Sequence, residues 1–204
     1  MTVRPLSADR FDATVTVFCD AFRDYPVMRY VIGAAGHYYD PRLRQLIGYF
    51  TESRFARQYP VLGIEAGEGT LVAAANINPP CGSPAPPSLK QTYENLRAAL
   101  GGEAIARLDA FVDTCAPFEP EAMHYHLGMI GVSHAEQGRG HARRLLDALH
   151  RMSRDDPESS GVSLTTETPR NLPLYEHFGY RVLGHGATPD GGLETWTLFR
   201  ADDD

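Results

Sequence analysis

A strand followed closely by an amphipathic helix is the feature that most limits how this chain can fold. Residues 124–132 are mostly apolar and predict a strand. Residues 138–154 predict a helix whose inward face carries Leu145, Leu146 and Leu149. Together with the elements expected elsewhere, this alternation favours an α/β or α+β fold, in which a single layer of sheet is covered by helices.

The rest of the chain fits this plan. Strands are expected over residues 2–6, 61–66, 70–78, 162–166, 180–183 and 194–199. Helices are expected around Phe11, Val15, Phe18 and Phe22, and over residues 40–57, 88–100, 103–115 and 171–178. Asp40 is predicted to cap the second helix, with Pro41 in its first turn. Pro26 is expected to break the first helix, and the proline-rich residues 79–89 to form a loop.

Composition narrows the class of protein. The 204 residues correspond to one domain by size, and 19 basic against 26 acidic residues give a net charge of −7. This acidic balance argues against a surface that binds nucleic acid. The negative charge can serve to bind a cationic small molecule, or it can serve only to keep the protein soluble. The three scattered cysteines, Cys19, Cys81 and Cys115, do not form a disulfide or zinc framework. No window approaches the ~18 apolar residues of a membrane helix, so we expect a cytoplasmic protein that binds no membrane.

The turn between the central strand and its helix has the features of an anion site. Gly138 and Gly140 allow the backbone to approach a ligand closely. The free N–H groups of a helix's first turn bind anions, and Arg139, Arg143 and Arg144 add positive charge nearby. A diphosphate would fit this turn, although two glycines can also serve only to make a tight turn. The pattern is neither a P-loop nor a dinucleotide-binding fingerprint.

The same turn carries a family resemblance. Gln137-x-x-Gly140-x-Ala142 is similar to the Q/R-x-x-G-x-G/A signature of the GCN5-related N-acetyltransferase (GNAT) superfamily. The resemblance implies that the pyrophosphate of acetyl-coenzyme A (acetyl-CoA) binds at this turn. The implied cofactor-binding residues there are Gln137, Gly138, Arg139, Gly140, His141, Ala142 and Arg143.

A second motif follows in the expected order. Asn171, Tyr175, Gly179 and Tyr180 resemble the N-x-x-x-Y-E-x-x-G-[FY] signature of the same superfamily. By itself Tyr175 could be an ordinary core tyrosine, with Asn171 capping a short helix. The resemblance implies that Asn171 contacts the coenzyme arm. It also implies that the Tyr175 hydroxyl protonates the departing thiolate.

The resemblance also implies an architecture. The GNAT fold is a mixed, mostly antiparallel sheet of six to seven strands, splayed between strands 4 and 5 and flanked by helices. Residues 1–204 would form a single domain, with a variable helical insertion over residues 79–118 and a frayed tail over residues 202–204. The segments A-F-x-D-Y-P and P-R-N-L-P-x-Y-E look like the puromycin N-acetyltransferase branch.

Three further catalytic and cofactor-binding predictions come from this comparison. In the histone-acetylating relatives the general base is a glutamate on the fourth strand, eleven residues before the Gln of the signature. The residue at that distance before Gln137 is His126. Imidazole titrates near neutrality, which suits a base, but a strand histidine can also be purely structural. Glu167, at the end of the next expected strand, is a second candidate, either as the base or as an anchor for the amine. Backbone groups around Ile130, Gly131 and Val132 would contact the coenzyme, and one of their N–H groups would stabilise the oxyanion.

The acceptor side and the reaction are less constrained. Asp24, Tyr25 and Tyr30 follow the first helix, where amine substrates of the family enter, but they also suit a capping and turn cluster. The implied activity is direct transfer from acetyl-CoA to the amine of a small molecule, in a ternary complex and without a metal. Peptide or protein N-acetylation and a non-catalytic coenzyme A sensor are the alternatives. The chain is expected to be a monomer or a homodimer.

Overall fold

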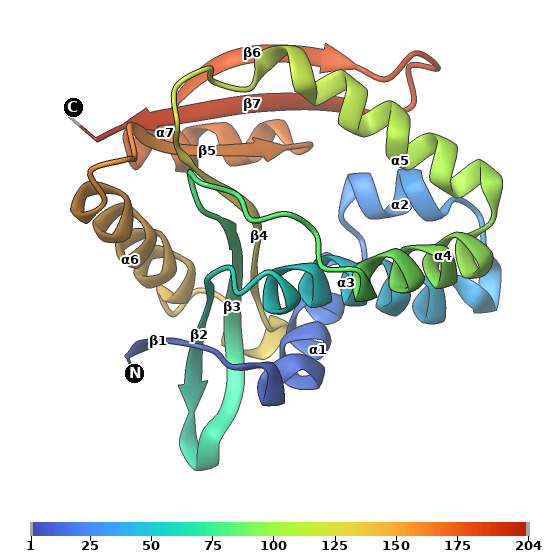
Figure 1. The fold of residues 1–204 in the computed structure, drawn as a ribbon, viewed down its shortest axis with the longest axis horizontal. Helices are drawn as coiled ribbons and strands as arrows, with labels where there is room; N and C mark the ends of the chain where they lie inside the picture. Colours follow the sequence, from blue (N-terminus) through green and yellow to red (C-terminus); the bar gives the residue numbers. More distant parts are fainter. Residues whose placement is uncertain (1, 203–204) are drawn as a thin grey trace.

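Seven strands form one sheet in the computed structural model, which describes residues 2–202 (Figure 1). The strands are β1 (Val3–Pro5), β2 (Val61–Ala66), β3 (Thr70–Asn78), β4 (Tyr125–Val132), β5 (Gly161–Thr166), β6 (Arg181–Ala187) and β7 (Glu194–Ala201). Their order across the sheet is β1-β2-β3-β4-β5-β7-β6. Every neighbouring pair is antiparallel except β4 and β5, which are parallel. The expected mixed, mostly antiparallel sheet is therefore confirmed.

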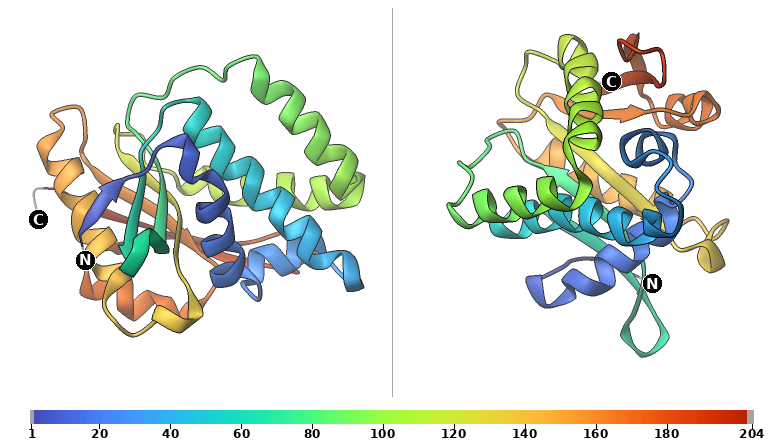
Figure 2. Two further views of the ribbon diagram at one scale, coloured as in Figure 1. Left: turned by 90° about the horizontal axis from the view of Figure 1, so that it is seen from below. Right: turned by 90° about the vertical axis from the view of Figure 1, so that its right-hand side faces the viewer.

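Helices cover both faces of this sheet (Figure 2). They are α1 (Phe11–Phe22), α2 (Pro26–Ile32), α3 (Tyr39–Ala56), α4 (Ser88–Leu100), α5 (Gly102–Cys115), α6 (His141–Asp155) and α7 (Leu172–His177). One buried core lies between the sheet and α1 to α5, and a second lies between the sheet and α6 and α7. The two faces of the sheet therefore pack against two separate apolar cores.

Three helix starts differ from the sequence predictions. Pro26 does not only end α1 but also begins α2, because proline suits the first position of a helix. Asp40 is not a cap: α3 begins at Tyr39, and the Asp40 carboxylate accepts two hydrogen bonds from Arg23 (3.0 and 2.7 Å). Asn171 occupies the cap position of α7 without a side-chain capping bond, because its own backbone is already helical (φ −82°, ψ −18°); its side-chain Nδ2 donates to Thr166.

The fourth and fifth strands separate partway along their length. Their pairing extends only from Tyr125 to Leu127 on β4. At that point the register between β3 and β4 shifts, which places Gly128 in a β-bulge. Tyr125 and Leu127 face α6, whereas Met129, after the bulge, packs on the opposite side of the sheet. The bulge explains the expected splay, since β4 turns away from β5 where its side chains change face.

The segment 79–118 forms α4 and α5, as expected, and α5 with the turn after it closes over the far end of the sheet (Figure 1). This close approach depends on glycines in β6. A Cβ on Gly184 would lie 2.0 Å from the Phe118 ring, and one on Gly186 would lie 2.9 Å from Thr114.

We therefore expect Gly184→Ala to destabilise the protein by about 1–3 kcal/mol, because the Phe118 ring must move out of its packed position. Chemical denaturation measures this change. Gly67→Ala is the matched control, since a Cβ there meets no atom within 4 Å. Equal unfolding free energies for the two variants would contradict the close packing of α5 on β6.

No helix among residues 2–202 is long and apolar enough to cross a membrane. The predicted frayed tail falls partly outside the described residues, which stop at Asp202. Asp202 itself is held in place, because its carboxylate accepts a hydrogen bond from Ser153 (2.6 Å).

Candidate active site

The turn between β4 and α6 is open on its outer side. Gly138 and Gly140 adopt positive φ angles of 75° and 76°, and a Cβ on either would meet no atom within 4 Å. These left-handed positions delay the helix, so α6 begins at His141 and not at residue 138. The Arg144 amide donates to the Gly140 carbonyl (3.2 Å). The amides of residues 141–143 thus lie at the helix's free N-terminal end.

Side chains fix the shape of this turn. The Gln137 amide donates to the Val132 carbonyl (3.3 Å), which ties the turn back to β4. His141 is buried and contacts Glu136 (3.3 Å), while the His134 amide donates to the Asp20 carboxylate of α1 (2.7 Å). The turn is therefore held in place from two sides while its glycines stay exposed.

The three arginines beside the turn are all exposed. Arg139 pairs with Glu136 (3.1 Å), and Arg143 lies 3.8 Å from Asp147 and over the Phe178 ring. Exposed pairs of this kind are weak and exchange readily. Arg139, Arg143 and Arg144 can thus turn toward an anion at the helix N-terminus.

A second group of side chains gathers where β5 ends. The Tyr25 hydroxyl forms a hydrogen bond with the Thr166 hydroxyl (2.9 Å) and accepts one from the Glu167 amide (3.3 Å). The side-chain Nδ2 of Asn171 also donates to the Thr166 hydroxyl (3.1 Å). Tyr175 is buried nearby, close enough for Tyr25 and Glu167 to affect its ionisation. Four residues that the sequence singled out thus come together around Thr166.

Glu167 has an environment suited to proton transfer. Its side chain is 7% exposed, and its Oε1 accepts a hydrogen bond from Thr195 (3.1 Å). Burial raises the pKa of the Glu167 carboxyl to about 7, although the hydroxyls of Thr195 and Tyr25 act in the opposite direction. Such a carboxyl can both accept and release a proton near neutral pH.

Tyr175 and Tyr25 remain protonated in this environment. Burial raises the pKa of the Tyr175 hydroxyl well above its ordinary value, and Tyr25 and Glu167 nearby add to the effect. Burial also raises the pKa of Tyr25 to about 12. Both hydroxyls can therefore donate hydrogen bonds at physiological pH.

His126 lies apart from this group. It sits where β4 and β5 are still paired, opposite Ser163, and its Nδ1 is 2.8 Å from the Ser163 hydroxyl. Burial lowers its pKa, so the ring is neutral near pH 7. Glu167 comes directly after β5, four residues beyond Ser163, a rise of ~13 Å. His126 and Glu167 are thus separate candidates for the base and not a pair.

His124, just before β4, and His126 both approach Glu119 (3.4 and 3.6 Å). Within residues 2–202, no three His, Cys, Asp or Glu side chains are grouped so that they could hold a metal ion.

The other predicted acceptor residues are engaged elsewhere. Asp24 is exposed and forms an ion pair with Arg29. The Tyr30 hydroxyl donates to Asp190 (3.1 Å), which connects α2 to the loop between β6 and β7. Of the three, Tyr25 alone reaches Glu167.

The backbone positions predicted on β4 have one free side. Ile130, Gly131 and Val132 pair with β3, but the pairing with β5 ends before them, at Leu127. Gly131 has an additional packing role, because a Cβ there would lie 2.9 Å from Phe18 of α1. The edge of β4 that faces β5 therefore presents unpaired backbone groups beside the turn.

Sequence reasoning missed Arg54 and Asn76. Arg54 lies at the end of α3, over Gly128, and Asn76 is fully buried on β3 below Thr51. One signal was available, since Arg54 follows Ile47 and Thr51 at helical spacing and these two are buried. An arginine on the inward face of a helix is unusual enough to suggest a function.

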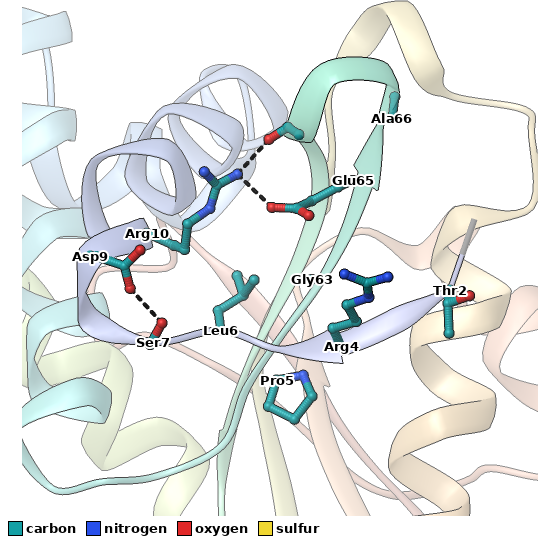
Figure 3. A pocket seen from close by; sticks show the side chains of 11 residues that line it. Thr2, Arg4, Pro5, Leu6, Ser7, Asp9, Arg10, Gly63, Glu65 and Ala66 are labelled. Carbon is teal, nitrogen blue, oxygen red and sulfur yellow. Dashed lines mark hydrogen bonds and ion pairs between the residues drawn. The ribbon is translucent and has the colours of Figure 1, made fainter.

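Two surface hollows lie away from these residues. One, of about 480 Å³, is bordered by β1 and β2 at the sheet's opposite edge, where Arg10 contacts Glu65 and the Gly69 carbonyl (2.7 Å each) (Figure 3). The other, of about 590 Å³, lies between α5 and the end of β6. We assign neither to the reaction, since neither includes a residue of the turn or of the Glu167 group.

Comparison with known sequences gives a consistent result. Residues 118–193 match the family model of an acetyltransferase (GNAT) domain, a range that includes the turn and Tyr175. A 56-residue segment is 36% identical to an uncharacterized N-acetyltransferase of Schizosaccharomyces pombe. That match covers 28% of this chain and 22% of the yeast protein.

Solved structures share the fold over nearly the whole chain. A structure from Corynebacterium glutamicum, described as "histone acetyltransferase HPA2 and related acetyltransferase", has a TM-score of 0.72 at 22% identity. The match covers 98% of this chain and 94% of the Corynebacterium chain. Arylalkylamine N-acetyltransferase 2 of Aedes aegypti has a TM-score of 0.66 at 10% identity, with 98% of each chain covered. A polyamine N-acetyltransferase of Drosophila melanogaster has a TM-score of 0.62 at 16% identity, covering 98% and 99%.

At these identities the solved structures establish the fold, and the domain match adds the family signature. Residues 118–193 thus match a GNAT acetyltransferase domain, and the chain as a whole is similar in fold to solved acetyltransferases.

Proposed function

We propose that this chain transfers an acetyl group from acetyl-CoA directly to the amine of a small molecule, in a ternary complex. The observation that carries the proposal is the position of two groups of residues. The open turn follows β4, and the Glu167–Tyr175 group follows β5. Because these strands are parallel, both groups lie at the same edge of the sheet, on either side of the splay.

The residues present suit acetyl-CoA. The pyrophosphate would contact the amides of residues 138–143, and the exposed arginines would balance its charge. The pantetheine arm would hydrogen-bond to the free edge of β4 at Ile130 and Val132, with Asn171 on the other side. This arrangement would place the thioester between the two strands, near Tyr175.

The proposed reaction assigns one proton to each side chain. Ionised Glu167 takes a proton from the acceptor ammonium, and the free amine attacks the thioester carbonyl carbon. A backbone N–H of β4 near residues 130–132 stabilises the oxyanion that forms. The C–S bond then breaks, Tyr175 gives its proton to sulfur, and the nitrogen releases its second proton to water. Transfer of a proton from Glu167 to Tyr175 through solvent restores both groups, so the net products are the amide, free coenzyme A and one proton.

Glu167 is preferred to His126 as the base in this proposal. Glu167 lies beside Tyr175 and titrates at about pH 7, whereas the Nδ1 of His126 is engaged by Ser163. His126 would then line the acceptor side of the sheet. Asp24 and Tyr30 would act on the acceptor only indirectly, through the position of α2.

The turn's contribution can be tested by calorimetry. A side chain in the left-handed region costs ~1–2 kcal/mol, so Gly140→Val is expected to reshape the turn and raise the Kd for coenzyme A by about tenfold or more. Gly69→Val introduces the same strain in the β2–β3 turn and is the control. Unchanged affinity in the Gly140 variant, or no binding by the original chain, would refute the proposed cofactor site.

The acceptor class can be tested by following free thiol release from acetyl-CoA. A small-molecule enzyme should release thiol with an amine panel, on which puromycin is included because of the resemblance to that branch. Turnover with peptides alone would point to protein N-acetylation. Coenzyme A binding without turnover on any acceptor would point to a sensor. Either result would overturn the proposed small-molecule activity.

A further inference from the structure

Arg54 is half-buried, and its guanidinium has few hydrogen-bond partners. Its Nη1 donates to the Phe50 carbonyl within its own helix (3.2 Å), and its Nε is buried without a partner. No carboxylate among residues 2–202 forms an ion pair with it. Burial lowers its pKa to about 10, with Arg57 adding to the effect, so it is still charged at neutral pH.

The guanidinium points to the place where β4 and β5 separate. A Cβ on Gly128 would lie 2.8 Å from Nη2 of Arg54. Gly128 is the bulge residue, immediately after the last paired position, Leu127. The absence of a side chain at Gly128 therefore makes room for the guanidinium at the start of the splay.

Other unsatisfied polar atoms lie on the same face of the sheet. The Oδ1 of Asn76 on β3 and the Oγ1 of Thr197 on β7 are buried without hydrogen-bond partners. Thr197 stands opposite Thr165 of β5, so the two share a face with Glu167, two residues further along that strand. Together these residues add polar groups to the α3 side of the sheet, next to the apolar core that includes Met129.

A lining of this kind is costly without a ligand. A partly buried charge without a counter-ion, and buried polar atoms without partners, lower the stability of a folded protein. An anionic group bound beside Arg54 would satisfy the charge, and the Thr197 hydroxyl can serve as a further donor on that face. The planar guanidinium matches a carboxylate, to which it can donate two parallel hydrogen bonds.

We propose that the acceptor is an amine that also carries a carboxylate, as α-amino acids do, and that Arg54 binds this carboxylate. The inference rests on the proposed acetyltransferase function and specifies its substrate class. Gly128 and Thr165 are the first residues beyond the paired segment of β4 and β5, and Glu167 comes two residues after Thr165. That offset suits a molecule whose carboxylate meets Arg54 while its neighbouring amine meets Glu167. Arg54 is thus a specificity-determining residue.

The test compares each of the twenty standard L-amino acids with its own amide, by thiol release. The amide keeps the side chain and the amine but removes the negative charge. Its amine is also the less basic of the two, so intrinsic reactivity favours the amide near neutral pH. We expect kcat/KM to be at least 30-fold higher for the acid in the best pair, and this ratio to fall to near 1 in Arg54→Gln. Arg57→Gln, which removes a neighbouring charge that contacts the Ser83 carbonyl, should keep the ratio.

A second measurement does not depend on turnover. With coenzyme A bound, titration with the same amino acids should shift the ¹⁵N resonance of the Arg54 Nε–H group, and the amides should not. Arg54→Met should raise the Tm of the free protein, because it removes a half-buried charge that has no counter-ion, and should abolish any Tm gain from the amino acids.

The outcomes separate the two proposals. Turnover of amides, or of puromycin, which lacks a carboxylate, at rates equal to or above those of the acids would overturn the role of Arg54 but keep the acetyltransferase. An acid preference that survives in Arg54→Gln would also overturn it, as would the absence of both turnover and an Nε–H shift with every amino acid. Failure to bind coenzyme A would instead refute the proposed function itself.

Discussion

Replacement of Tyr175 by phenylalanine is expected to lower kcat by about 10²–10³-fold, while the Kd for coenzyme A stays within about threefold. The side chain is 8% exposed, so the variant keeps its packing and loses only the hydroxyl. Because burial keeps that hydroxyl protonated, its loss removes the proton that the leaving sulfur needs. Steady-state kinetics and calorimetry on the same preparation measure the two quantities.

Tyr180→Phe is the matched control for this experiment. The two rings are neighbours, with centroids 5.7 Å apart, but the Tyr180 hydroxyl bonds to His150 (2.9 Å) and not to the Glu167 group. Its loss should reduce stability slightly and leave kcat unchanged. Equal turnover in Tyr175→Phe and the original chain would remove Tyr175 from the mechanism.

Replacement of Glu167 by glutamine should have an effect of similar size and a distinct pH dependence. If ionised Glu167 is the base, kcat/KM of the original chain rises as pH increases through about 7, where this carboxyl loses its proton. Glu167→Gln should lower kcat/KM by about 10²–10³-fold and remove this rise. Glu65→Gln, on β2 beside Arg10, is a control that should keep the normal profile. A rise near pH 7 that persists in Glu167→Gln would identify another group as the base.

The same residue links stability to pH. In the folded protein the Glu167 pKa is raised from 4.5 to about 7, so ionisation opposes folding. Its effect on stability is absent below about pH 4.5 and grows to ~3 kcal/mol of lost unfolding free energy above pH 7. Glu167→Gln should therefore be more stable than the original chain at pH 8 and similar to it at pH 4. Denaturation curves at the two pH values measure the difference in unfolding free energy between Glu167→Gln and the original chain. A difference that is the same at pH 4 and pH 8 would contradict this expectation.

Much of the local structure could be predicted from the sequence. The strands over residues 61–66 and 70–78 and the helix over residues 88–100 are found at those bounds. Alternation of side chains in strands and the spacing of apolar residues in helices are local properties, so they can be read without knowing what packs against them. Predictions were wrong where a residue has a partner far away in the sequence. The Asp40 carboxylate, for example, accepts hydrogen bonds from Arg23 and does not cap α3.

The sequence by itself determined the strand, the two-glycine turn and the helix that follow one another from β4 to α6, because each depends only on neighbouring residues. Only the tertiary structure brought Tyr25 of the first loop to Glu167, and Arg54 of α3 to the bulge at Gly128. These contacts depend on the sheet order, on the parallel pairing of β4 and β5, and on the point where that pairing ends. Such long-range pairings have no signature in local spacing, since it is burial across the whole sheet that selects them.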